Sequence, residues 1–297
     1  GVQGVGIAER AYQQALAYAQ DRKQGRAINM DDHGPHEIIH HPDVRRTLAV
    51  MKAKIEAGRA ICYHAAVEAD LGEHMDDADE KAWSKRREDL MIPIAKAWCT
   101  DMGVDVASMG VQVHGGMGFI EETGAAQHLR DARIAPIYEG TNGIQAIDLV
   151  GRKLARDGGT AMAELIEDVR QTVEDCITSS NPDLPVLAEA LKPACDALED
   201  ATKWMLDASD ADRLAGATAY LKLAGDVTGG WLLCVGAVAA QRKLKEADGE
   251  ESYAQARIAI ANIFAQTALA GAAGLLGEIK LGYDPVFGPG EAVLASA

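Results

Sequence analysis

The sequence predicts an all-α fold built from two helical bundles in series. Apolar residues recur at helical spacing along most of the 297 residues, and strand-like alternation never extends beyond a few positions. Aromatic residues make up 5% of the chain while alanine and leucine are abundant, which favours helices over sheet. A chain of this length can bury two separate cores.

The first portion, residues 1–156, opens with a helix whose apolar face carries Ile7, Ala11 and Ala15. A long second helix is expected from Pro42, because proline is favoured in the first helical turn. Helices are predicted at about 5–24, 42–70, 88–109, 121–131 and 144–156, with a charged connection at 72–89 and a glycine-rich stretch at 110–119. In the last of these helices, Ile144, Ile147, Leu149, Val150 and Leu154 form the expected apolar face.

Gly158-Gly159 and an abrupt rise in acidity mark a boundary, so residues 157–297 are expected to form a helical extension. Four further helices are predicted at about 160–179, 184–207, 211–247 and 251–280, followed by an irregular tail at 281–290. Residues 258–277 carry no charge and are long enough to cross a bilayer, but they are rich in small and polar residues. A helix packed through small residues is therefore the favoured interpretation, without a membrane span.

The net charge of −16 argues against binding to nucleic acid or to an anionic membrane. It is unevenly divided, with −4 over residues 1–156 and −12 over residues 157–297. The basic cluster at 21–26 could meet a phosphate, although on charge alone a solvated helix end is favoured. Five cysteines without a CxxC pair indicate free thiols in a reducing cytoplasm.

Two stretches carry weak chemical signals. Gly115, Gly116 and Gly118 strip side chains from a short connection, so that backbone amides could approach a cofactor, but a helix-capping glycine cluster explains them equally well. Four histidines gather near three aspartates on a broken loop, at His33, His36, His40 and His41. Their spacing lacks a single helical face, so a solvated loop is favoured over a metal site.

The third stretch is more unusual. Glu139 lies between Tyr138 and a Gly-Thr-Asn-Gly run, after the apolar residues Ile134 and Ile137 and before a helix. Apolar surroundings raise the pKa of a carboxyl group and a helix N-terminus lowers it. A base that removes a proton from a weak carbon acid needs the first effect. A first-turn glutamate that merely complements the helix dipole remains the alternative on these grounds.

Residues 90–149, from "LMIPIAKAW" through "QVHGGMGF" to "IYEGTNGIQAIDL", resemble the C-terminal catalytic half of the acyl-CoA dehydrogenase family. The helix at 4–26 resembles that family's helix with an Arg-Lys-x-Phe-Gly ending. Residues 157–297 resemble the extra helical extension of a subgroup that includes methylmercaptopropionyl-CoA dehydrogenase. The resemblance implies an FAD-dependent enzyme that desaturates an acyl-CoA thioester between its α and β carbons.

The resemblance also implies roles for individual residues. Glu139 would remove the pro-R α-proton, a hydride would pass from the β-carbon to N5 of FAD, and a trans-2-enoyl-CoA would result. Tyr138 and Gly140 would contact the substrate. The FAD-binding residues implied are Arg22 and Gln24 at the pyrophosphate, Gln112, Val113, His114, Gly115 and Gly116 at the adenine end, and Thr141, Asn142 and Gly143 along the flavin. Arg22 would serve the flavin of a neighbouring subunit in a homodimer or a dimer of dimers, and an electron-transfer flavoprotein would accept the electrons.

Several departures from the family pattern are visible. Gly25 follows Gln24 where the family has phenylalanine, Met117 replaces a frequent polar residue, and Asn142-Gly143 replaces a more usual Ser-Gln pair. The family also places a helical domain and a small β-domain ahead of this bundle. The chain is therefore expected to be a C-terminal portion of a longer enzyme and to be inactive alone. An acyl-CoA oxidase or nitroalkane-type oxidase, and a non-catalytic helical interaction module, remain as alternatives.

Overall fold

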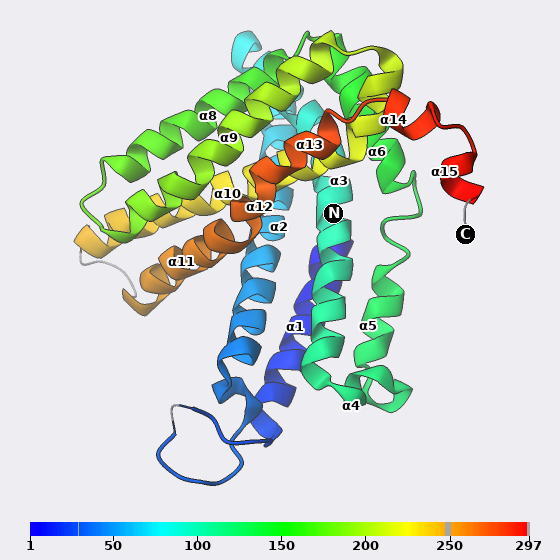
Figure 1. Cartoon of the computed structure of the whole chain (residues 1–297). Coiled ribbons are helices and arrows are strands. Elements are labelled where there is room, and N and C mark those ends of the chain that lie inside the picture. Colours follow the sequence, from blue (N-terminus) through cyan, green and yellow to red (C-terminus); the bar gives the residue numbers. More distant parts are fainter. Residues whose placement is uncertain (29, 247–250, 296–297) are drawn as a thin grey trace. The chain divides into compact units, whose positions relative to one another are not determined.

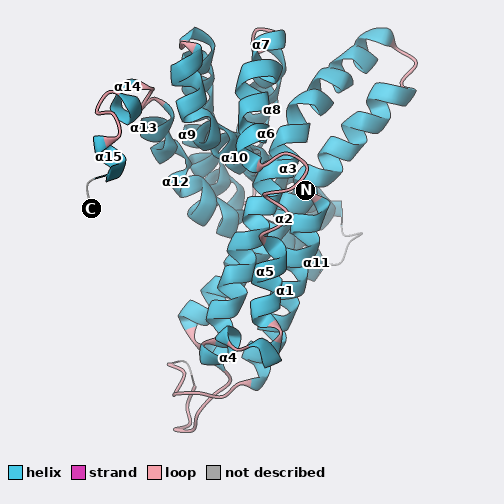
Figure 2. Cartoon of the chain, turned by 90° about the vertical axis from the view of Figure 1, so that its right-hand side faces the viewer, coloured by secondary structure: helices cyan, strands magenta, loops and turns pink. Residues whose placement is uncertain are grey.

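The computed structural model describes residues 1–28, 30–246 and 251–295, and their regular structure is helical (Figures 1 and 2). The sole β contact within those residues is an isolated bridge between Lys23 and Glu37. The predicted all-α fold is thus confirmed. The chain forms two compact units, which we call unit 1 (Gly1–Arg59 and Cys99–Glu139) and unit 2 (Ala60–Trp98 and Gly140–Ala297).

Unit 1 contains the beginning of the second long helix and the end of the third. Its elements are α1 (Val2–Asp21), η1 (Ile38–His40), the first part of α2 (Pro42–His74), the second part of α3 (Ala78–His114), α4 (Gly116–Phe119), η2 (Glu121–Thr123) and α5 (Ala125–Ala132). Glycine allows α1 and α3 to approach closely: a Cβ atom on Gly4 would lie 2.2 Å from the carbonyl oxygen of Cys99. The backbones of these two helices are therefore in direct contact.

Unit 2 contains the remaining parts of α2 and α3 and all later helices. These are α6 (Asn142–Asp148), η3 (Leu149–Lys153), α7 (Leu154–Arg156), α8 (Thr160–Ile177), α9 (Asp183–Asp207), α10 (Asp210–Glu246), α11 (Glu251–Phe264), η4 (Ala265–Leu269), α12 (Ala270–Ala272), η5 (Ala273–Leu275), α13 (Leu276–Ile279), α14 (Asp284–Phe287) and α15 (Ala292–Ala295). Helix α10 packs against α8, α9 and α11. The indole Nε1 of Trp231 donates to Thr172 Oγ1 at 2.9 Å, which joins α10 to α8.

The predicted connection at 72–89 is wrong for most of its length, because α3 already begins at Ala78. The carboxylate of Asp77 accepts the backbone N–H groups of Asp79 at 2.9 Å and Glu80 at 3.0 Å, and so caps the helix. Its charged residues are then paired across unit 2, since Arg86 contacts Glu164 and Arg87 contacts Asp168, each at 2.8 Å. These long-range partners make a charged stretch compatible with a packed helix.

The apolar face predicted after Glu139 is only partly correct. Leu149, Val150 and Leu154 are buried, but Ile144 and Ile147 are exposed. The helix passes through a π-helical turn at Leu149–Lys153, which rotates the face presented to the core relative to a regular helix. The tail predicted to be irregular contains the short helix α14. The rings of Tyr283 and Phe287 stack there, with 4.2 Å between their centroids.

Two helical runs are long and apolar enough to cross a membrane, namely Asp210–Leu244 and Glu251–Ile279. In the first run, 72% of an 18-residue apolar segment is buried inside the protein, as in the core helix of a globular bundle. In the second the buried share is 33%, so the close burial predicted for 258–277 holds for one face alone. Ile258, Ala261 and Phe264 lie on that buried face. Length and composition by themselves are weak evidence for a span.

Candidate active site

The backbone around Glu139 has an unusual conformation. After α5, the N–H groups of Ile137 and Tyr138 both donate to the carbonyl of Ile134, at 3.0 and 3.1 Å, in a compact turn. Glu139 then has φ of 53°, and it is the one non-glycine residue with positive φ in the described part of the chain. Gly140 follows with φ of 83°. A side chain in this left-handed region costs about 1–2 kcal/mol, and such strain gathers at functional sites.

The Glu139 side chain is exposed within this chain, and Tyr138 beside it is half-buried. The neighbouring apolar side chains do not enclose the carboxylate, since Ile134 is 53% exposed and Ile137 is 50% exposed. The apolar residues next to Glu139 in sequence therefore lie at the surface of the chain and do not form a pocket around it. Enclosing the carboxylate in an apolar pocket would require groups other than those next to it in sequence.

The residues after Glu139 are fixed by polar contacts. Thr141 caps α6, and its hydroxyl accepts the Ile144 N–H at 3.3 Å. Lys96 of α3 donates from Nζ to the Gly140 carbonyl and to Asn142 Oδ1, both at 2.8 Å. Asn142 Nδ2 donates to the carbonyl of Ala97 at 3.0 Å. The Asn142 side chain is thus directed to α3, and its predicted contact with a flavin stays a prediction, as do those of Thr141 and Gly143.

Lys96 is the functional candidate that the sequence reasoning missed. It lies 44 positions before Gly140, so no local pattern links the two residues. The available signal was a single lysine within the apolar run "MIPIAKAW".

The predicted pyrophosphate-binding residues follow the end of α1. Arg22 is exposed, and its guanidinium has no ion pair among residues that the structure describes. The backbone here is held by the histidine loop: Gln24 N–H donates to the His36 carbonyl at 2.9 Å, and His41 Nε2 lies 2.7 Å from the Gln24 carbonyl oxygen. His36 Nδ1 accepts the Ala27 N–H at 3.0 Å. These two histidines therefore shape the loop that follows Arg22.

Three of the predicted adenine-binding residues, Gln112, Val113 and His114, form the end of α3, while Gly115 lies in the turn after it and Gly116 begins α4. Gln112 is exposed, whereas Val113 and His114 are buried. Gly115 turns the chain with φ of 60°, and no atom lies within 4 Å of the position a Cβ would take there or at Gly116. The exposed glycine backbone leaves space for a ligand, so the donor set is compatible with a dinucleotide. Gly118 has a packing role instead, because its Cβ would lie 2.2 Å from the Val111 carbonyl oxygen.

The structure brings two of the three predicted FAD-binding segments, the one at Arg22 and Gln24 and the one at 112–116, together at one end of unit 1. The ring of Tyr18, one turn before Arg22, stacks on His114 with 4.5 Å between ring centroids. Helix α4 lies at the N-terminal end of α5, and the chain that leads to Glu139 leaves from the C-terminal end of α5 (Figure 1). An eight-residue helix spans about 12 Å, and the turn after it adds further separation. Glu139 is therefore not brought together with Arg22 in unit 1.

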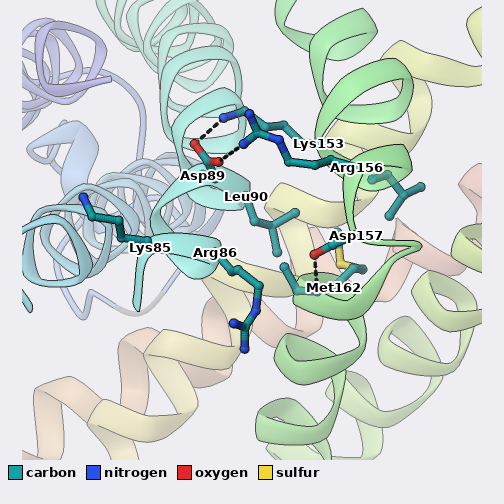
Figure 3. A pocket seen from close by; sticks show the side chains of 10 residues that line it. Lys85, Arg86, Asp89, Leu90, Lys153, Arg156, Asp157 and Met162 are labelled. Atoms are coloured by element: carbon teal, nitrogen blue, oxygen red, sulfur yellow. Dashed lines mark hydrogen bonds and ion pairs between the residues drawn. The ribbon is translucent and has the colours of Figure 1, made fainter. Parts of the chain in front are cut away.

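A cavity of about 310 Å³ lies within unit 2, between α3 and the α7–α8 turn (Figure 3). None of the predicted site residues lines it. Asp89 accepts from Lys153 at 2.5 Å and from Arg156 at 2.7 Å. Partial burial raises the pKa of Asp89, but the hydrogen bond from Lys153 and the two cationic charges outweigh it and hold that pKa below its usual value. Asp157 caps α8 through the Ala161 N–H at 2.9 Å, so these charges are satisfied internally.

Family models match two parts of the chain. The model described as "Acyl-CoA dehydrogenase, C-terminal domain" matches residues 1–154, and the model described as "Acetyl-CoA dehydrogenase C-terminal like" matches residues 165–288. The first covers more than half of the 297 residues. The chain belongs to the acyl-CoA dehydrogenase family, and the resemblance noted in the sequence is confirmed.

Individual relatives agree with this membership. The chain is 44% identical over 272 residues to 3-methylmercaptopropionyl-CoA dehydrogenase of Ruegeria pomeroyi, covering 91% of this chain and 46% of that protein. It is 32% identical over 283 residues to a broad-specificity linear acyl-CoA dehydrogenase of Mycobacterium tuberculosis, with the same coverage of both chains. The chain thus spans about half the length of these relatives.

Solved structures support the fold. An acyl-CoA dehydrogenase complexed with FAD from Bacillus anthracis superposes with a TM-score of 0.69 at 20% identity, over 94% of this chain and 47% of that one. An acyl-CoA dehydrogenase homologue of Caenorhabditis elegans, in complex with C11-CoA, superposes with a TM-score of 0.66 at 21% identity, over 90% and 41%. At these identities the likeness concerns the fold alone.

Proposed function

We propose that this chain is the C-terminal catalytic part of an FAD-dependent acyl-CoA dehydrogenase, with Glu139 as the base. The observation that carries the proposal is the left-handed Glu139, held next to a capped helix in the family's catalytic region. Strain at a single carboxylate is expected where its position matters for chemistry. The proposed division of the chain is a catalytic helical domain at 1–156 and a helical extension at 157–297.

In the proposed reaction the Glu139 carboxylate takes the α-proton of an acyl-CoA thioester. Tyr138 lies beside the acyl group, and Gly140, which has no side chain, leaves space for the thioester. FAD, when bound, accepts the hydride that leaves the β-carbon. Because the Glu139 side chain is exposed in this chain, water must be excluded by other parts of the enzyme before the carboxylate becomes an effective base. The chain alone is therefore proposed to be inactive.

The cofactor is proposed to be held by groups that the structure leaves accessible. The Arg22 guanidinium, which forms no ion pair with the residues that the structure describes, suits a diphosphate because its planar fork matches phosphate oxygens. Gln24, Gln112 and the exposed backbone of Gly115 and Gly116 would supply neutral hydrogen bonds, whereas Val113 and His114 are buried. Since Arg22 and Glu139 lie beyond different ends of α5, one chain would contribute to two flavin sites. We therefore propose a homodimer or a dimer of dimers, with an electron-transfer flavoprotein as acceptor in the cytoplasm.

An anaerobic titration of the full-length gene product with acyl-CoA thioesters tests the proposal. The absorbance of the oxidised flavin should bleach, and Glu139→Gln should retain the flavin but reduce it at least a thousandfold more slowly, about 4 kcal/mol in the barrier. Absence of bound flavin would favour a helical interaction module instead. Rapid reoxidation of the reduced protein by oxygen would assign it to the oxidases.

A further inference from the structure

One lysine connects the turn at Glu139 to a different helix. Lys96 Nζ lies 2.8 Å from the carbonyl oxygen of Gly140 and 2.8 Å from Asn142 Oδ1. Asn142 Nδ2 lies 3.0 Å from the carbonyl oxygen of Ala97, the residue after Lys96. Two adjacent residues of α3 therefore hold two residues of the chain that follows Glu139. We call this set of three hydrogen bonds the Lys96 clamp.

The clamp acts where the backbone is least favourable. Glu139 and Gly140 both have positive φ, a conformation that is unfavourable for the non-glycine residue of the pair. A strained conformation persists when its surroundings determine it from several directions. On the upstream side the turn at Ile134 restrains Tyr138. On the downstream side the clamp fixes the peptide plane that follows Gly140.

The chemistry of the contact suits a lysine. An ammonium has three donors on a flexible four-carbon stem, and two of them here meet a carbonyl and a carboxamide oxygen. Hydrogen bonds from a charged donor are about twice as strong as neutral ones. Methionine would fill a similar stem but donate nothing. Arginine would keep the charge and offer its donors in a planar fork.

We propose that Lys96 is a positioning residue for the Glu139 base, acting through the Gly140 carbonyl rather than by touching substrate. The inference rests on the proposed function and adds the group that directs its carboxylate. Loss of the clamp would let residues 139–140 relax to conformations in which the carboxylate is displaced. A displacement of about 1 Å costs up to about a hundredfold in rate. Binding of the acyl-CoA through its other contacts should be affected much less.

The test compares Lys96→Met, Lys96→Arg and a matched control in the flavin-loaded full-length protein. The control is Lys203→Met, which removes an exposed ion pair with Glu199 (2.7 Å) on α9. Stopped-flow measurement gives the limiting rate of flavin reduction and the acyl-CoA concentration at half-saturation. Lys96→Met should lower the rate about ten- to a hundredfold, with flavin content and half-saturation within about twofold of the parent. Lys96→Arg should recover most of the loss, and Lys203→Met should match the parent.

A limiting rate within twofold of the parent for Lys96→Met would overturn the inference, as would a change confined to half-saturation. If Lys96→Met loses its flavin or fails to fold, Asn142→Ala decides, because it removes one acceptor of the lysine and the bond to Ala97. That variant should reduce flavin about tenfold more slowly at normal flavin content, and an unchanged rate would refute the clamp. If the parent does not bleach, or Glu139→Gln bleaches as fast, the proposed function itself fails and the inference falls with it.

Discussion

Two glycines of α10 provide a sharp test of the packing around the α3 segment that carries Lys96. A Cβ atom on Gly225 would lie 2.2 Å from Cδ1 and 2.4 Å from Cγ of the Trp98 ring. A Cβ atom on Gly236, eleven positions later in the same helix, would have no atom within 4 Å. The substitution to alanine is identical at both sites. The predicted effects on stability have opposite signs.

The magnitudes follow from the contacts. Ordinary van der Waals contact begins at 3.4 Å, so alanine at position 225 forces the Trp98 ring to move by more than 1 Å. That ring is held by a hydrogen bond of 2.9 Å from Nε1 to the buried Asp226 carboxylate. Overpacking costs about 1–3 kcal/mol, and losing a bond to a charged acceptor costs about 1.5–3 kcal/mol. Replacing a helical glycine by alanine returns about 1 kcal/mol. Gly225→Ala should therefore destabilise by about 1.5–5 kcal/mol, and Gly236→Ala should stabilise by about 1 kcal/mol.

Urea unfolding followed by circular dichroism at helical wavelengths measures both variants against the parent. The difference should appear in the unfolding midpoint while the slope with denaturant stays constant, because the surface exposed on unfolding is unchanged. Equal shifts for the two variants, or a stabilised Gly225→Ala, would refute the packing of Trp98 on α10. If the slope of unfolding free energy against urea concentration changed for one variant alone, the substitution would have altered the compactness of the folded or the unfolded state instead.

Three further predictions address the site and its surroundings. Arg22→Gln should retain flavin about tenfold less tightly, read as flavin absorbance per protein after dialysis, and full retention would contradict a role at the pyrophosphate. Burial and the charge of Arg87 lower the pKa of His64 to about 4, whereas in the unfolded chain the same imidazole binds its proton near pH 6.5. The free energy of unfolding should therefore fall as the pH drops from about 6.5 to about 4. His64→Gln should flatten the plot of unfolding free energy against pH over this range. Cys62 is partly accessible whereas the other four thiols are buried, so one thiol should react promptly with a disulfide reagent in the native protein and five in denaturant; prompt reaction of several would contradict the described packing.

The helices were largely predictable because local periodicity reflects which side of each helix meets a core. α1, α2, α8, α9 and α10 end within a few residues of the predicted bounds. The start of α3 was not predictable, since Arg86 and Arg87 look solvated in sequence and find Glu164 and Asp168 about 80 positions later. The predicted burial of Ile144 and Ile147 was wrong for a related reason. Their spacing is helical, but a π-helical turn rotates the buried face.

The sequence by itself predicted the family and the all-α class correctly, and through the family resemblance it gave Glu139 as the candidate base, because these depend on residue identities and short spacings. Only the tertiary structure decided the left-handed backbone at Glu139 and the contact of Lys96 with the Gly140 carbonyl. It also showed that Arg22 and Gln112 belong to one end of unit 1, through the stacking of Tyr18 on His114. Such features depend on groups that are distant in the chain. The contacts that stabilise these features form only when the helices pack, so a local sequence pattern cannot predict them.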